Sequence, residues 1–195
     1  MVVYLRTLNE PVRASLGLPA SELFPLMHVG GLGPLLSILK IELGREAATM
    51  VMLATVAAAA GTRWLPAFAL LFGVWDLVFY AALKILIGWP VSLWTWDLLF
   101  LIPVPWTGPV LAPSIVAASL VAGGLIGLMR PVRQSRTALA LIVVGAAVII
   151  VSFTWDWRWI FAGGVPRVFP WWIFWSGEFL GIAGVSLSLM GKTEG

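Results

Sequence analysis

Cysteine is absent from the chain, which excludes disulfide bonds, thiolate nucleophiles, zinc–thiolate sites and iron–sulfur clusters. Histidine occurs once, as His28, and one imidazole without a second strong ligand is weak support for a haem or copper site. No zinc-protease, kinase or serine-hydrolase signature is visible. The sequence therefore predicts no metal and no cofactor, assigns no catalytic residue, and favours a protein that is not an enzyme.

Charged residues are also scarce, at 11% of the chain, whereas 61% of the residues are hydrophobic. Soluble domains are about half apolar and roughly a quarter charged, so this composition predicts an integral membrane protein in contact with membrane lipids. The net charge of +3 would suggest a nucleic-acid partner for a soluble protein. In membrane proteins Lys and Arg collect in cytoplasmic loops, and no nucleic-acid partner is expected.

Long apolar stretches make up most of the chain. Each should be helical, because lipid offers no hydrogen-bond partner to the backbone. A membrane β-barrel would instead alternate apolar and polar residues. We therefore predict an all-α, polytopic helix bundle over 45–191, with a polar N-terminal tail at 1–22 and a C-terminal tail at 192–195. The five predicted spans are 45–61, 66–88, 109–129, 137–154 and 171–190.

Two apolar segments do not fit a simple span. Residues 23–44 are interrupted by Pro34 and a glycine cluster, which favours an interfacial or partly inserted segment; a re-entrant piece and a sixth span are the alternatives. A sixth span would place the N-terminus in the cytoplasm. Residues 97–105 are too few to cross, and Pro103 and Pro105 prevent a continuous helix, so we expect a re-entrant or interfacial loop in the outer leaflet.

One connection sets the orientation. Loop 130–136 carries three arginines and is the most basic loop of the chain. Basic loops stay in the cytoplasm, so we place this loop and the C-terminus inside, and the loops 89–108 and 155–170 outside, an inner or plasma membrane. Ten of the twelve tryptophans lie in or beside the two outer loops, which predicts a tryptophan-rich outer face. They are Trp89, Trp94, Trp96, Trp106, Trp155, Trp157, Trp159, Trp171, Trp172 and Trp175.

Ionisable residues occur inside two spans, where they are costly and often mark a functional site. Asp76 is followed at helical spacing by Tyr80 and Lys84, and Glu178 lies in the last span. At about 1.5 Å per residue, Asp76 is roughly 15 Å from the inner end of its span and Glu178 roughly 10 Å from the outer end of its own, so the two carboxylates could meet. One interpretation is a proton or cation site with Lys84 at its exit. The other is a buried hydrogen-bonded cluster that holds helices together.

Two further polar sets lie toward the outer side. Acids beside indole rings suit cations and sugars, although interfacial tryptophans with Asp as a turn or cap residue explain the same pattern. A charge cluster at the start of the first span is either an ordinary helix start or a site for lipid headgroups. The outer-face set comprises Trp94, Trp96, Asp97, Trp155, Asp156 and Trp157, and the interfacial cluster comprises Glu42, Arg45 and Glu46.

Two pairs of glycines, each spaced by four residues, predict where helices approach closely. They are Gly123 with Gly127 and Gly177 with Gly181. The second pair brackets Glu178, so we expect this acid to lie against another helix and not against lipid.

Two stretches of the chain carry a resemblance. They read GVWDLVFYAALKILIGWPVSLWTWDLLFLIPVPWTGPVLAP and, more loosely, LKIELGREAATMVMLA. Over residues 39–118 the chain resembles an uncharacterised group of bacterial polytopic membrane proteins. The resemblance implies a bacterial membrane setting, which we expect to be the inner membrane, but no activity. It directs attention to Arg45, Glu46, Asp76, Tyr80, Lys84, Trp96 and Asp97.

Three functions are compatible with these features. The first is a non-enzymatic accessory subunit or an outer-face lipid- or ligand-binding membrane protein, because short loops and small-residue helix faces favour partner membrane subunits or a homo-oligomer. The second is a small proton- or cation-coupled transporter that uses Asp76 and Glu178. The third is a membrane enzyme acting on a lipid-linked substrate, with Asp97, Asp156 or Glu46 as general acid or base. We expect the first.

Overall fold

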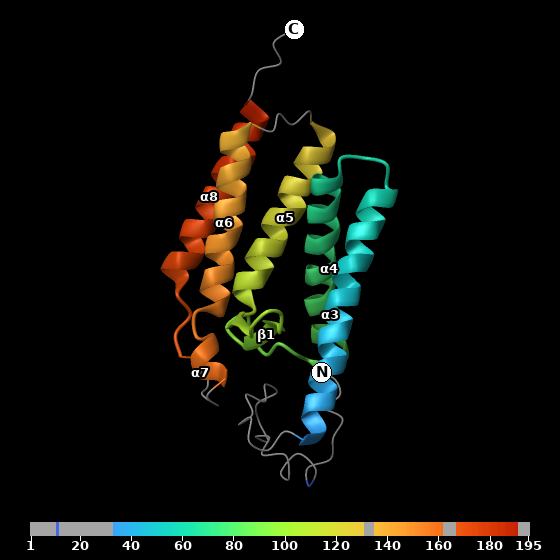
Figure 1. Ribbon diagram of the computed structural model, residues 1–195, viewed down its shortest axis with the longest axis vertical. Helices are drawn as coiled ribbons and strands as arrows, with labels where there is room; N and C mark the ends of the chain where they lie inside the picture. The colour runs from blue at the N-terminus through green and yellow to red at the C-terminus, as the bar shows by residue number, and fades with distance from the viewer. Residues whose placement is uncertain (1–10, 12–32, 131–134, 162–166, 191–195) are drawn as a thin grey trace.

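The structure is a computed structural model that describes residues 11, 33–130, 135–161 and 167–190. Among these residues, five long helices lie side by side along the longest axis of the molecule (Figure 1). A short helix and an antiparallel hairpin lie at one end of the bundle. The predicted all-α architecture is confirmed apart from this hairpin. The elements are α3 (Gly33–Ala59), α4 (Trp64–Ile87), β1 (Trp96–Phe100), β2 (Trp106–Pro109), α5 (Leu111–Met129), α6 (Arg136–Thr154), α7 (Trp157–Phe161) and α8 (Trp171–Met190).

Four helical segments are long and apolar enough to cross a membrane, which supports the prediction of a membrane protein. They are Trp64–Ile87, Leu111–Met129, Arg136–Ile160 and Trp171–Met190. Helix α3 is also long, but every 18-residue part of it contains Glu42, Arg45 and Glu46. Charged side chains at bilayer depth are costly, so α3 does not qualify as a span by composition.

The start of the bundle differs from the prediction. Helix α3 begins at Gly33, so the later part of the segment 23–44 and the predicted span 45–61 form one helix. Pro34 does not interrupt it, because the first turn of a helix needs no backbone donor at that position. The N-terminal part of α3 extends past the level of the hairpin, whereas its later part runs beside α4 (Figure 1). Residues 23–32 lie outside the described residues.

Glycines allow the spanning helices to pair closely. A Cβ atom added to Gly73 of α4 would lie 2.5 Å from a backbone oxygen of α5, and one added to Gly124 of α5 would lie 2.8 Å from a backbone oxygen of α4. A Cβ atom added to Gly145 of α6 would lie 2.7 Å from the carbonyl oxygen of Gly177 in α8. The predicted contact at Gly177 is confirmed, whereas Gly123 faces open space and its neighbour Gly124 makes the contact. One residue turns a helix by about 100°, so spacing without a known partner does not identify the contacting face.

The segment predicted as a re-entrant or interfacial loop forms a β-hairpin. Trp96 lies opposite Pro109 and Asp97 opposite Gly108 in its antiparallel register. The prolines that exclude a helix, Pro103 and Pro105, lie between the two strands, where no ladder hydrogen bond is lost. Sequence reasoning excluded the helix correctly but overlooked the strand alternative.

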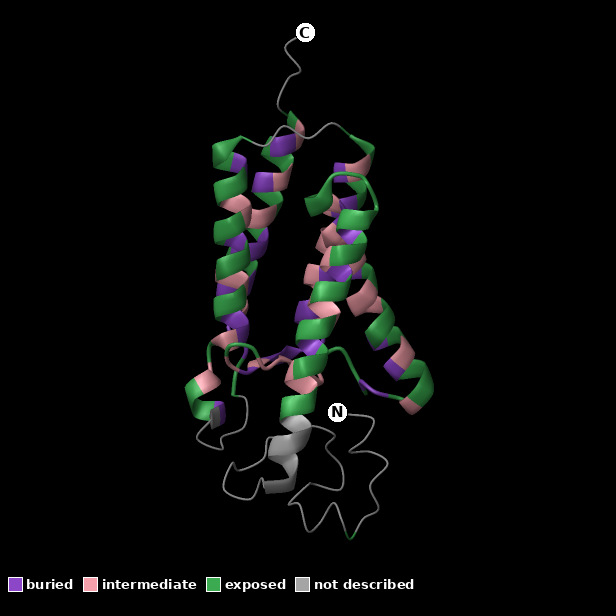
Figure 2. Cartoon of the chain, turned by 45° about the vertical axis from the view of Figure 1, so that its right-hand side comes forward, coloured by how far each residue is buried: buried purple, intermediate pink, exposed green. Residues whose placement is uncertain are grey.

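Two clusters of buried side chains lie toward the hairpin end. One cluster of buried side chains comprises Tyr80, Leu83, Trp89 and Val110, and another comprises Ala112, Phe153, Phe169 and Phe174. Exposed residues cover the outward faces of the long helices (Figure 2). Many of them are large and apolar, such as Ile85, Leu86 and Met129. An apolar exterior of this extent suits contact with lipid.

The connections alternate between the two ends of the bundle. The link from α3 to α4, the facing ends of α5 and α6, and the end of α8 lie together at one end (Figure 1). The hairpin and α7 lie at the other, with the segments that carry ten of the twelve tryptophans. The predicted gathering of tryptophans on one side of the molecule is therefore observed.

Candidate binding cavity

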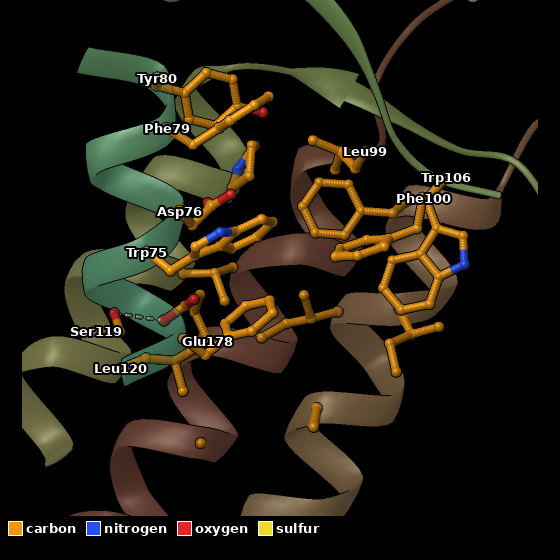
Figure 3. A pocket seen from close by; sticks show the side chains of 18 of the residues that line it. Trp75, Asp76, Phe79, Tyr80, Leu99, Phe100, Trp106, Ser119, Leu120 and Glu178 are labelled. Atoms are coloured by element: carbon orange, nitrogen blue, oxygen red, sulfur yellow. Dashed lines mark hydrogen bonds between the residues drawn. The ribbon is translucent and has the colours of Figure 1, made fainter. Parts of the chain in front are cut away.

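A cavity of about 800 Å³ lies within the bundle and is lined by α3, α4, α5, α6, α8 and the hairpin (Figure 3). Its polar groups are unevenly distributed. Glu46, Asp76 and Asp97 line the part near the hairpin, and Glu178 lies in the first half of α8, which begins at the hairpin end. Toward the opposite end the walls are almost entirely aliphatic, with Leu120, Gly123, Ile126, Ile142, Ala146, Ile182, Val185 and Leu189. The cavity is therefore amphipathic along its length.

Asp97 lies inside this cavity and not on the outer face. The hydroxyl of Tyr80 donates a hydrogen bond of 2.7 Å to its Oδ2, and the Leu98 amide donates one of 2.8 Å to its Oδ1. Burial raises the pKa of Asp97 to about 6, although both hydrogen bonds act to lower it. Successive strand residues point to opposite faces, and Trp96 accordingly packs elsewhere, against Phe169. Asp97 thus connects the hairpin to α4.

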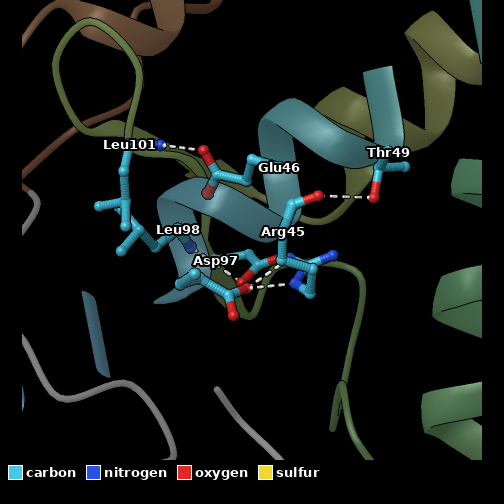
Figure 4. Close-up of polar contacts among 7 residues, drawn as sticks. Arg45, Glu46, Thr49, Asp97, Leu98 and Leu101 are labelled. Atoms are coloured by element: carbon cyan, nitrogen blue, oxygen red, sulfur yellow. Dashed lines mark hydrogen bonds and ion pairs between the residues drawn. The ribbon is translucent and has the colours of Figure 1, made fainter. Parts of the chain in front are cut away.

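The interfacial cluster is divided between two tasks. Arg45 forms an ion pair with Glu42, with Nε 2.9 Å from Oε1. Glu46 is buried and accepts a hydrogen bond of 3.0 Å from the amide of Leu101, just beyond β1 (Figure 4). The hairpin is therefore held by α3 through Glu46 and by α4 through Tyr80. All three charged residues of the cluster line the cavity.

The two intramembrane acids, Asp76 and Glu178, line the same cavity (Figure 3). Ser119 of α5 donates a hydrogen bond of 3.1 Å to Oε2 of Glu178. Among the described residues, no side chain or amide donates a hydrogen bond to Asp76. The two acids thus share a cavity, as their depths suggested, without a hydrogen bond between them, and Glu178 lies against a neighbouring helix as expected.

Lys84 does not belong to this group. Its ammonium donates to the carbonyl oxygens of Pro90, at 2.8 Å, and Val91, at 3.4 Å, and its side chain does not line the cavity. Eight residues separate Lys84 from Asp76, which rotates the side chain by about 80° around the helix. Lys84 therefore binds the connection that follows α4, and its role at the exit of a proton or cation path stays a prediction.

The predicted outer-face set is also separated. Asp156 pairs with Arg167 at 3.1 Å, and the guanidinium of Arg158 lies 5.2 Å from the ring centroid of Trp157. Edge-to-face contacts engage Trp94 with Trp171 and Trp155 with Trp172. Of the six residues in that set, Asp97 alone lines the cavity. Residues 94–97 lie at the hairpin and residues 155–157 lie at the junction of α6 and α7, so the two halves of the set belong to different elements.

An aromatic wall completes the cavity and was missed in the sequence. Ring centroids of Phe72 and Trp75 are 5.9 Å apart, as are those of Trp75 and Phe79. From Phe72 the wall continues to Phe100 at 6.4 Å, and from Phe100 to Trp106 at 5.4 Å. The signal was present, because aromatic residues recur along α4 at intervals of three or four, from 64 through 68, 72 and 75 to 79, the spacing of one helix face.

No protein-family model, curated protein or solved structure matches this chain. Within the described ranges, no three acidic or histidine side chains converge as they would around a metal ion. Glu46 and Asp97 position the hairpin, and Asp156 pairs with an arginine, so the acids named for an enzymatic role are engaged in structural contacts.

Proposed function

We propose that this chain is a non-enzymatic membrane protein of the bacterial inner membrane that binds an amphipathic, membrane-soluble molecule. The observation that carries the proposal is the cavity of about 800 Å³, within the range of small-molecule sites. Its walls are mainly apolar and aromatic, with a few fixed polar groups, as such sites require. A ligand would place its polar head near the hairpin and its apolar tail along the aliphatic end.

The dimensions of the aliphatic end support a hydrocarbon tail. Lining residues of α8 extend from Glu178 to Leu189, a helical length of about 16 Å. Burying apolar surface over that length contributes roughly 25 cal/mol per Å². An entirely polar ligand would gain nothing from these walls.

The membrane topology belongs to the same proposal. We place five crossings in the bilayer, the four apolar helices and the part of α3 that runs beside α4. The hairpin and α7 face outward, and loop 130–136 and the C-terminus face the cytoplasm. Support comes from the basic loop and from the tryptophan-rich end opposite to it.

Filling the cavity tests the proposal. Gly123 lines it, and a Cβ atom there meets nothing within 4 Å, so Gly123→Leu has room at its Cβ and adds apolar volume to the cavity. Gly44→Leu is the matched control, because Gly44 is equally open but does not line the cavity. We expect native mass spectrometry of the protein extracted from its membrane to show a retained amphiphile in the wild type and in Gly44→Leu, and about tenfold lower occupancy in Gly123→Leu. Equal occupancy in all three proteins would refute the proposal.

A second candidate is a proton- or cation-coupled transporter, supported by the shared lining position of Asp76 and Glu178. Its signature would be substrate flux into proteoliposomes that responds to a pH gradient and is lost in Asp76→Asn. Flux indifferent to both would remove this candidate.

A further inference from the structure

We propose that the head of the bound molecule is an organic cation and that Asp76 is its counter-ion. The inference rests on the proposed function, because it assigns the chemical class of the ligand of that same cavity.

The lining of the cavity has a strong excess of acidic groups. Among the described residues that line it, five carry a carboxyl group: Glu42, Glu46, Asp76, Asp97 and Glu178. One lining residue, Arg45, carries a positive charge, and its guanidinium is already paired with Glu42. An anionic head would meet repulsion here, and a cationic head would meet complementary charge.

Asp76 differs from the other acids in having no hydrogen-bond donor among the described residues. Glu46 accepts a hydrogen bond from the Leu101 amide, and Glu178 accepts one from the Ser119 hydroxyl. Asp97 accepts two hydrogen bonds. A carboxylate held in an apolar cavity without a partner is costly, and a partner of opposite charge offsets much of that cost. A bound cation supplies the missing partner.

Aromatic faces flank Asp76 along α4. Trp75 precedes it and Phe79 lies one turn later, and both rings line the cavity with centroids 5.9 Å apart (Figure 3). Ring faces attract alkylammonium and quaternary ammonium groups, and tryptophan does so most strongly. A metal ion would need several converging oxygen ligands, which the described residues do not provide. The site therefore favours an amine or quaternary amine that carries a hydrocarbon tail.

Three probes with the same alkyl tail but different head groups separate the effect of charge from that of apolar burial. They are dodecyltrimethylammonium, dodecanol and dodecanoate, titrated calorimetrically into the purified full-length protein in maltoside micelles. We expect the ammonium probe to bind about tenfold more tightly than the alcohol, and the carboxylate to bind most weakly. In Asp76→Asn this preference should vanish while the affinity for dodecanol stays unchanged. Asp156→Asn, which alters an acid outside the cavity, should keep the preference.

Two further variants guard against a trivial loss of fold. Asp76→Glu retains the charge and should keep the ammonium preference, and Trp75→Leu should weaken the ammonium probe more than the alcohol. Equal affinities for ammonium and alcohol in the wild type would overturn the cationic head and leave the amphiphile-binding function intact. Affinities for all three probes that are unaffected by Gly123→Leu would instead overturn the proposed function itself.

Discussion

At the scale of single residues, the acids of this protein differ by their partners and not by their type. Asp97 accepts hydrogen bonds from Tyr80 and Leu98 and joins two elements, whereas Asp76 has no donor among the described residues and faces the cavity. A residue with a purely structural role is expected to stabilise the fold. Asp76 is costly where it lies, in agreement with the ligand-binding role that we propose for it.

Asp97 makes the stability of the protein depend on pH. Its pKa rises from 3.8 in the unfolded chain to about 6 in the folded one, so the folded state holds the proton more tightly. This contribution is fully present below pH 4 and is lost as the pH rises through 6. It amounts to about 3 kcal/mol at most, at 1.4 kcal/mol for each pH unit between the two values. Thermal unfolding in maltoside micelles should therefore occur at a higher temperature at pH 5 than at pH 7.5, with a smaller difference in Asp97→Asn. An identical pH dependence in that variant would contradict the assignment.

At the scale of elements, close contacts between backbones decide how the helices pair. The α4–α5 and α6–α8 pairs both depend on glycines at points where a side chain has no room. In membranes such contacts replace the hydrophobic effect as the source of helix association. The cavity is lined by both pairs, so the way the helices pair sets the position of its walls.

Gly145→Ala should disrupt the α6–α8 pair. The added methyl group would lie 2.7 Å from backbone atoms of Gly177 and Gly181, which cannot move aside independently of their helix. We expect a loss of about 1 to 3 kcal/mol in the free energy of unfolding, measured by denaturant titration in mixed micelles. Gly123→Ala is the control, because its methyl group meets nothing within 4 Å and alanine gains up to about 1 kcal/mol in a helix interior. The assignment fails if the two variants are equally stable.

At the scale of the whole molecule, the two ends differ in charge and in aromatic content. The segments that carry most of the tryptophans lie at the hairpin end, whereas α5 ends just before Arg130 and α6 begins at Arg136 at the opposite end. This asymmetry is the basis of the proposed orientation, because basic loops usually remain in the cytoplasm. The mouth of any ligand path near the hairpin would then face outward.

The absence of cysteine allows a direct test of this orientation. Thr62 lies in the connection between α3 and α4, and Val91 lies before the hairpin, 75% exposed. In intact cells, a membrane-impermeant maleimide should label Val91→Cys, whereas Thr62→Cys should react after permeabilisation only. The reverse pattern would invert the proposed topology.

Sequence reasoning reached the membrane setting, the helical bundle and the positions of the acids within it. Those results depend on hydropathy and on the rise of a helix, which are local properties. It placed the start of the first helix too late. Pro34 and the nearby glycines suggested a break, whereas Pro34 lies in the first turn of α3, where proline is tolerated. It also missed the hairpin and the aromatic wall.

By itself, the sequence determined that this is a membrane protein and that acids lie within its apolar helices. Both follow from hydropathy and helical rise, which can be read from short stretches of one chain. Only the tertiary structure decided which side chains face one another. In the fold, Asp97 points into the cavity and accepts a hydrogen bond from Tyr80, and Lys84 lies away from the cavity. Asp76 and Glu178 line the same cavity. The physical reason is that partners come from different helices, whose relative rotation is set by close contacts such as that of Gly145 with Gly177.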